Sequence, residues 1–161
     1  VGTHVELPRH FTKGGKTLDD YPLSKFYGYG LLLDIKQEYI TAEYMEELTK
    51  EKDLKDRIIL FKNSYSETVL PKLKVEASEW MVKKGVSIIG FEDGKGGINI
   101  GETEEIGHKN HEIMLMNDIL RIEFVDGLNK ISKEEFFVFA LPLNISNVDS
   151  LGIRLVAIED K

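Results

Sequence analysis

Short apolar segments typical of β-strands alternate with helix-like segments along this chain, and this alternation constrains its fold more than any other feature. The strand-like segments are rich in β-branched and aromatic residues, as in Arg57-Ile-Ile-Leu-Phe-Lys62. Strands are predicted at residues 29–35, 57–62, 86–91, 121–125, 136–141 and 151–158, and helices at 41–48, 75–84 and 108–120. Such a pattern is typical of an α/β domain with a mostly covered mixed sheet.

Local end signals support two of these helices, and glycine-rich stretches separate several elements. Thr41 is the expected N-cap of the first helix, and Gly85 is the expected residue just after the second. Residues 11–24 and 93–101 are predicted loops. With 161 residues, no internal repeat and no long linker, residues 1–161 are predicted to form a single domain.

The opening segment carries the residues best suited to chemistry. In an extended strand, side chains two positions apart point to the same side, so His4 and Glu6 are expected to project together. Pro8 stiffens the chain after them, and His10 follows immediately. One imidazole, one carboxylate and a second imidazole in so short a span suit a metal ion with a proton-transfer partner.

A second histidine pair lies far along the sequence. His108 and His111 are three residues apart in the third predicted helix and therefore share a face. Glu123 follows in the next predicted strand, between Ile122 and Phe124, and is expected to point away from their face. A second histidine and carboxylate set is what a catalytic zinc site or a two-metal hydrolytic site requires.

Composition excludes several classes of function. A formal net charge of −7 argues against nucleic acid and against an anionic membrane surface as partners. Cysteine is absent, which excludes disulfides and thiolate chemistry and is consistent with a reducing, cytoplasmic compartment. The apolar runs are too short to span a bilayer, and no signal peptide is visible.

Gly2-Thr-His-Val-Glu-Leu-Pro-Arg-His10 resembles the signature of the cyclase-like metal hydrolases, the family that includes bacterial kynurenine formamidase. The family pattern runs His-x-Gly-Thr-His-x-Asp-x-Pro-x-His. The resemblance continues, in order, through the stretches 15–23, 31–35, 59–65, 77–90, 139–143 and 154–157. It therefore extends over essentially the whole chain.

The resemblance implies a swivelling β/β/α fold, a divalent metal, zinc or manganese, and hydrolysis of a small amide, formamide or cyclic amide-like substrate. By matching position, it implies that the metal ligands are His4, Glu6, His111 and Glu123. It implies that His10 is the catalytic general acid and base. The implied partners are a small-molecule substrate and further copies of the chain, in a homodimer or homotetramer.

The sequence departs from the family pattern at its start. The first histidine of the pattern falls immediately before Val1, and the family's longer N-terminal segment is absent from this sequence. Glu6 stands where the pattern has aspartate, which adds one methylene to a ligand whose metal–oxygen distance is about 2.0–2.2 Å for zinc. The backbone or the coordination must adjust to the longer side chain.

Alternatives remain open for individual residues and for the function. Glu123 could be a solvated strand residue, His111 a helix-surface residue, and His108 is expected to be one. The glycine-rich segment 93–97 lacks the full phosphate-loop spacing and is better interpreted as a turn. The alternatives to hydrolysis are a metal-dependent cyclase or dehydratase, and a degenerate family member that binds a metal or small ligand without turnover.

Overall fold

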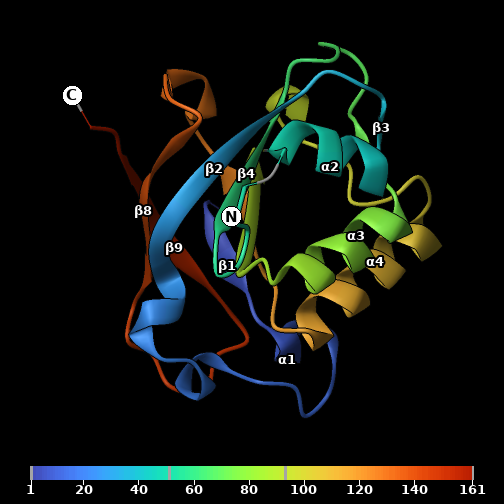
Figure 1. Ribbon diagram of the computed structural model, residues 1–161. Coiled ribbons are helices and arrows are strands. Elements are labelled where there is room, and N and C mark those ends of the chain that lie inside the picture. The colour runs from blue at the N-terminus through green and yellow to red at the C-terminus, as the bar shows by residue number, and fades with distance from the viewer. Residues whose placement is uncertain (1, 51, 93, 161) are drawn as a thin grey trace.

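The computed structural model describes residues 2–50, 52–92 and 94–160, and within them seven strands form one closed sheet (Figure 1). The order around the barrel is β1-β7-β6-β4-β2-β8-β9, and β9 pairs with β1 to close it. These strands are β1 (His4–Glu6), β2 (Tyr27–Ile35), β4 (Ile58–Asn63), β6 (Ile88–Glu92), β7 (Leu120–Val125), β8 (Glu135–Pro142) and β9 (Ser150–Ile158). The predicted α/β class and the mixed sheet are confirmed.

Helices pack against one side of the barrel, beside its parallel strands, as Figure 1 shows. Parallel neighbours require crossover connections, and helices supply them between β2 and β4, β4 and β6, and β6 and β7. The helices are α1 (Pro8–Phe11), α2 (Ala42–Thr49), α3 (Val75–Lys84) and α4 (Glu104–Met116), and a small separate sheet pairs β3 (Tyr39–Ile40) with β5 (Lys72–Leu73). The outer faces of β8 and β9 carry exposed side chains, so the sheet is covered mainly along its parallel strands.

The barrel has two apolar cores, one on each face of its parallel strands. In β4, Ile58 and Leu60 face the barrel interior, whereas Ile59 and Phe61 face the helices. All four side chains are essentially inaccessible to solvent, which explains the continuous apolar run in this strand. Gly90 of β6 lies at a tight point of the interior, where an added Cβ would be 2.8 Å from Leu60 Cδ2.

Helix ends agree with the sequence prediction in α2 and α3 but not in α4. The Thr41 side chain accepts a hydrogen bond from Tyr44 N, and Gly85 adopts a left-handed conformation with φ of 71°. The prediction of a third helix over 108–120 was wrong at both ends. The helix begins at Glu104 after the N-cap Thr103, and it ends at Met116 before the left-handed residue Asp118.

The predicted loops contain short turns of 3-10 helix. Residues 18–20, 23–26 and 94–96 adopt this conformation, and α1 occupies the start of the region before residue 12. Asp93, at the start of the second predicted loop, lies outside the described residues. No helix in the described part of the chain combines the length and apolar character that crossing a membrane requires.

Candidate metal centre

The site is built on the antiparallel pairing of β1 with β7. His4 lies opposite Glu123 and Glu6 lies opposite Arg121, with the Val5–Ile122 pair between them. Because successive side chains alternate between the faces of a strand, the four polar residues share one face and the two apolar ones share the other. Val5 and Ile122 belong to the barrel core. The polar face therefore points out of the barrel, toward the side where α1 and α4 lie.

Three of the predicted ligands converge. His4 Nε2 lies 3.9 Å from Glu6 Oε1 and 4.0 Å from Glu123 Oε2. Among the described residues, these three side chains form a group whose ligand atoms all lie within 4.8 Å of one another. One imidazole nitrogen and two carboxylate oxygens are a suitable donor set for zinc or manganese. Ligand atoms of a tetrahedral zinc lie about 3.4 Å apart, so the two distances from His4 Nε2 to the carboxylates would have to contract by about half an ångström.

The imidazole of His4 is oriented for metal binding by its own backbone contacts. Nδ1 donates a hydrogen bond to the carbonyl of Gly2 at 3.1 Å, so the lone pair is on Nε2, the atom that faces the carboxylates. Phe124 packs against the ring, with centroids 5.5 Å apart, and Thr3 Oγ1 donates to the Phe124 carbonyl at 2.8 Å. The histidine is thus fixed in tautomer and in position.

Phe124 does not follow the regular strand alternation. Its φ of 55° is left-handed, which is strained for a bulky side chain, and the pairing of β6 with β7 shifts register at this point. Alternation predicted that Phe124 would share the face of Ile122. The bulge instead places its ring on His4, while Glu123 keeps the predicted orientation away from Ile122.

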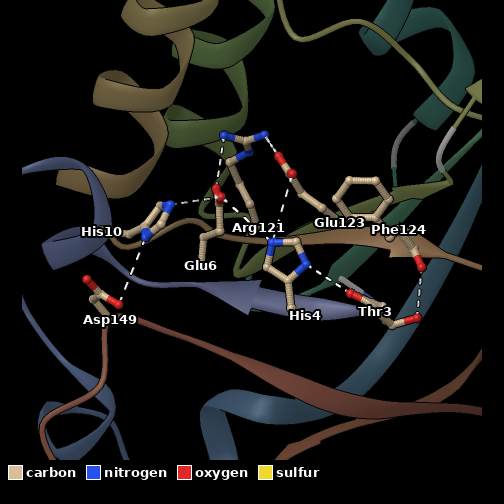
Figure 2. Close-up of polar contacts among 9 residues, drawn as sticks. Thr3, His4, Glu6, His10, Arg121, Glu123, Phe124 and Asp149 are labelled. Atoms are coloured by element: carbon tan, nitrogen blue, oxygen red, sulfur yellow. Dashed lines mark hydrogen bonds and ion pairs between the residues drawn. The ribbon is translucent and has the colours of Figure 1, made fainter.

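A buried arginine connects the two carboxylates. Arg121 Nη1 lies 3.2 Å from Glu6 Oε2, and Nη2 donates a hydrogen bond to Glu123 Oε1. The side chain is 1% exposed, and burial lowers its pKa although both glutamates oppose this shift. Burial also raises the pKa of Glu123, and Arg121 counteracts part of that rise. Figure 2 shows the guanidinium above the two carboxylates, on the opposite side from His4.

His10 joins the cluster from α1. It lies four residues after Glu6, and the turn begun by Pro8 brings His10 Nε2 to 3.4 Å from Glu6 Oε1. On the other side of the ring, Nδ1 lies 4.0 Å from Asp149 Oδ1, as Figure 2 shows. The side chain is about half exposed, at 47%. One nitrogen therefore faces the candidate metal site while the other faces a carboxylate.

The fourth predicted ligand lies apart from this cluster. His111 is on α4, where its Nδ1 donates a hydrogen bond to the Gly107 carbonyl at 2.6 Å. Its ring stacks on Phe11 of α1, with centroids 5.5 Å apart. These two contacts keep it outside the ligand group of the described residues, and its role as a ligand stays a prediction. His108 is exposed on the same helix, as expected for a surface residue.

Sequence reasoning missed two residues of the site. Arg121 precedes Glu123 by two residues in a predicted strand, so the same alternation that placed Glu123 also placed Arg121 on its face. That signal was present in the sequence and was not used. Asp149 reaches His10 only because Leu7 N bonds to the Asp149 carbonyl at 2.9 Å, a long-range contact that no local pattern indicates.

Comparison with known proteins gives one family match and several distant relatives. The Cyclase family model matches residues 1–95, a range that includes His4, Glu6 and His10. A kynurenine formamidase of Bacillus mycoides is 24% identical over 165 residues, which cover 97% of this chain and 74% of that protein. A kynurenine formamidase of Bacillus anthracis matches with the same identity and coverage.

Two solved structures have a similar fold. One, described as a potential metal-dependent hydrolase with cyclase activity, has a TM-score of 0.77 and 22% identity, covering 100% of this chain and 79% of that one. Isatin hydrolase A from Labrenzia aggregata has a TM-score of 0.76 and 16% identity, covering 98% and 72%. At these identities the likeness establishes the fold.

Proposed function

This chain belongs to the Cyclase family, and from its site we propose that it is a metal-dependent hydrolase of a C–N bond in a small amide, formamide or cyclic amide-like substrate. One observation supports this most directly. His4, Glu6 and Glu123 offer three ligand atoms within 4.8 Å, and His10 Nε2 lies 3.4 Å from one of the carboxylates. A proton-transfer group therefore adjoins a site that can bind a cation.

The donor set is suited to zinc or manganese. His4 would bind through Nε2, Glu6 through Oε1 and Glu123 through Oε2, the atoms that face one another. Within the described residues, Glu6 Oε2 is buried against Arg121 Nη1 at 3.2 Å without hydrogen-bond geometry, which leaves Oε1 on the side of His4 for a cation. A divalent cation bound here supplies Lewis acidity toward a carbonyl oxygen and makes water nucleophilic near neutral pH.

His10 would move the proton that the reaction requires. Hydrolysis adds one water across the C–N bond, so the carbonyl carbon gains an oxygen and the leaving nitrogen gains a proton. His10 Nε2 faces the site, and an imidazole is the side chain best suited to take up and release a proton near neutral pH. Asp149 faces Nδ1 at 4.0 Å and would hold the ring in this orientation.

The names of the relatives suggest the first substrates to test. The Bacillus relatives are named kynurenine formamidase, and one solved relative is named isatin hydrolase. Both names describe cleavage of an amide C–N bond next to an aromatic ring. We therefore propose N-formylkynurenine and isatin as the initial probes, with release of formate and of the ring-opened acid as the respective measurements.

The deciding experiment compares His10→Asn with His108→Asn, an exposed histidine substitution on α4. We expect His10→Asn to lower kcat about 10²–10⁴-fold while the metal content measured by elemental analysis is unchanged. The His108→Asn variant should retain full activity. Normal turnover by His10→Asn would contradict its assigned role.

Product analysis distinguishes the other functions. A product formed by loss of water would favour a cyclase or dehydratase, because hydrolysis consumes water. A protein that binds zinc or manganese but converts neither probe would favour a degenerate member that binds without turnover. A protein that binds neither metal would contradict the proposed metal-dependent activity.

Finer assignments accompany this proposal. We propose the swivelling β/β/α description of the fold, supported by the closed mixed sheet with helices on one side. A homodimer or homotetramer and a cytoplasmic location also remain proposals, as does His111 as an additional ligand. Sedimentation analysis of the purified protein measures the oligomeric state directly.

A further inference from the structure

Arg121 is the buried charged residue of this cluster that the proposed chemistry does not use. Its side chain is 1% exposed, and a buried guanidinium is costly unless charged partners compensate it. Glu6 and Glu123 supply that compensation from two adjacent strands, through Nη1 and Nη2 respectively. The Phe91 ring contributes a further contact, with its centroid 5.6 Å from Cζ. The arginine is therefore held between the two acids by the sheet itself.

The two carboxylates divide their oxygens between Arg121 and His4. Glu6 directs Oε2 to the guanidinium and Oε1 to His4 and His10. Glu123 directs Oε1 to the guanidinium and Oε2 to His4. The two carboxylates can thus bind a cation on the side of His4 and on the opposite side, and the Arg121 guanidinium already occupies the opposite side. A two-metal centre would need both sides, because its ions lie about 3.5–4 Å apart between shared ligands.

We propose that Arg121 is a built-in cation that occupies one of the two cation positions between Glu6 and Glu123, so that this centre takes a single divalent metal ion. The inference rests on the proposed function, since it assigns the metal stoichiometry of that same site. Charge balance supports it. The two carboxylates and the guanidinium leave one net negative charge, so one divalent ion brings the centre to +1 whereas two would bring it to +3.

The pairing register fixes Arg121 in this role. Arg121 lies directly opposite Glu6 in the β1–β7 ladder and two residues before Glu123, so the register places its side chain beside both acids. Its Nε and Nη1 atoms have no hydrogen-bond partner among the described residues. The guanidinium is thus held by one hydrogen bond from Nη2 to Glu123, by its ion pair with Glu6 and by packing. Arg121 acts through the acids and is a positioning residue.

The first test uses the native protein and does not depend on activity. Chelator-treated protein is titrated with Mn²⁺, and bound metal is measured by equilibrium dialysis and by electron paramagnetic resonance. We expect one Mn²⁺ per chain at saturation, with the spectrum of an isolated ion. Two Mn²⁺ per chain with an exchange-coupled spectrum would overturn the inference while leaving metal-dependent hydrolysis intact. No bound Mn²⁺ or Zn²⁺ would contradict the proposed function and, with it, this inference.

The second test removes the built-in cation. Arg121→Met keeps an unbranched apolar stem but removes the charged guanidinium, and we expect the variant to bind a second Mn²⁺ and to bind the first at least about tenfold more tightly. Arg121→Lys retains a positive charge and should still bind one ion. Arg154→Met, an exposed substitution on β9, should match the native protein. An Arg121→Met variant with native stoichiometry and native affinity would refute the assignment, and circular dichroism of each variant reports whether it has folded.

Discussion

A buried amide on α4 should be among the most sensitive single positions in this fold. Asn110 is 0% exposed. Its Nδ2 donates to the carbonyls of Leu73 at 3.0 Å and Ile100 at 2.5 Å, and its Oδ1 accepts from Ser78 Oγ at 2.9 Å. One side chain thus joins α4 to β5, to the loop before α4, and to α3. These contacts fix the helix layer beside the parallel strands.

The substitution Asn110→Leu keeps the approximate volume and removes all three hydrogen bonds. It leaves two carbonyl oxygens and one hydroxyl buried without this partner, and each such group costs about 1–3 kcal/mol. Leucine is the better helix former by about 0.5 kcal/mol, which offsets a small part of the loss. Taking the low end of that range for each of the three groups, we expect the free energy of unfolding to fall by about 3 kcal/mol. At this chain length, that corresponds to a decrease of about 6–12 °C in Tm.

Urea unfolding followed by circular dichroism, in chelator so that bound metal adds nothing, measures this loss. Ser78→Ala removes one of the three bonds and should cost about 1 kcal/mol. Asn117→Leu makes the same replacement at the exposed end of α4 and should cost less than about 1 kcal/mol. A loss below about 1 kcal/mol for Asn110→Leu would refute the argument, because the orphaned carbonyls would then have found other partners.

Two further substitutions test the barrel and its acid stability. Gly30→Ala would place a Cβ 2.5 Å from Val138 Cγ2, so we expect a loss of about 1–3 kcal/mol in a thermal melt, and an unchanged Tm would contradict this close approach. For Asp118, partial burial raises the pKa, but hydrogen bonds from Lys16 and Tyr21 outweigh it and hold the pKa below its ordinary value. Its stabilisation is therefore present above the unfolded pKa of about 3.9 and is lost as pH falls through the folded pKa. Asparagine tolerates the same left-handed backbone, with φ of 60°. Asp118→Asn should therefore lower the free energy of unfolding by about 0.5–1 kcal/mol at pH 7 and leave it unchanged in strong acid. A loss of stability that is the same at both pH values would indicate a structural cause.

The fold was predictable where local chemistry decides it. The helix predicted at 75–84 has those limits in the structure, because Gly85 can adopt the left-handed conformation that ends it. The helix predicted at 108–120 was displaced by four residues. Its true N-cap is Thr103, whose side chain accepts from Ile106 N, and its end is set by the turn at Asp118. Both signals are local, but the predicted helix was started at His108 and not at the N-cap Thr103.

The sequence predicted three residues of the candidate site that lie together in the structure, but not the residues around them. His4, Glu6 and Glu123 were named from a sequence signature, and the structure brings them together through the β1–β7 register. That register also places Arg121 among them, which no spacing rule for metal ligands would suggest. The left-handed Phe124 depends on a bulge in the pairing of two distant strands, and bulges carry no local pattern that identifies them.

The three-residue strand β1 pairs with β7 on one side and with β9 on the other, so it completes the ring of strands as well as presenting His4 and Glu6. Pairing of β1 with its two neighbours therefore closes the barrel and brings His4 and Glu6 to Glu123 at the same time. A cation that binds only the paired arrangement adds its binding free energy to that closure. The stability of the closed sheet and the affinity of this site for a cation are therefore expected to be coupled through β1.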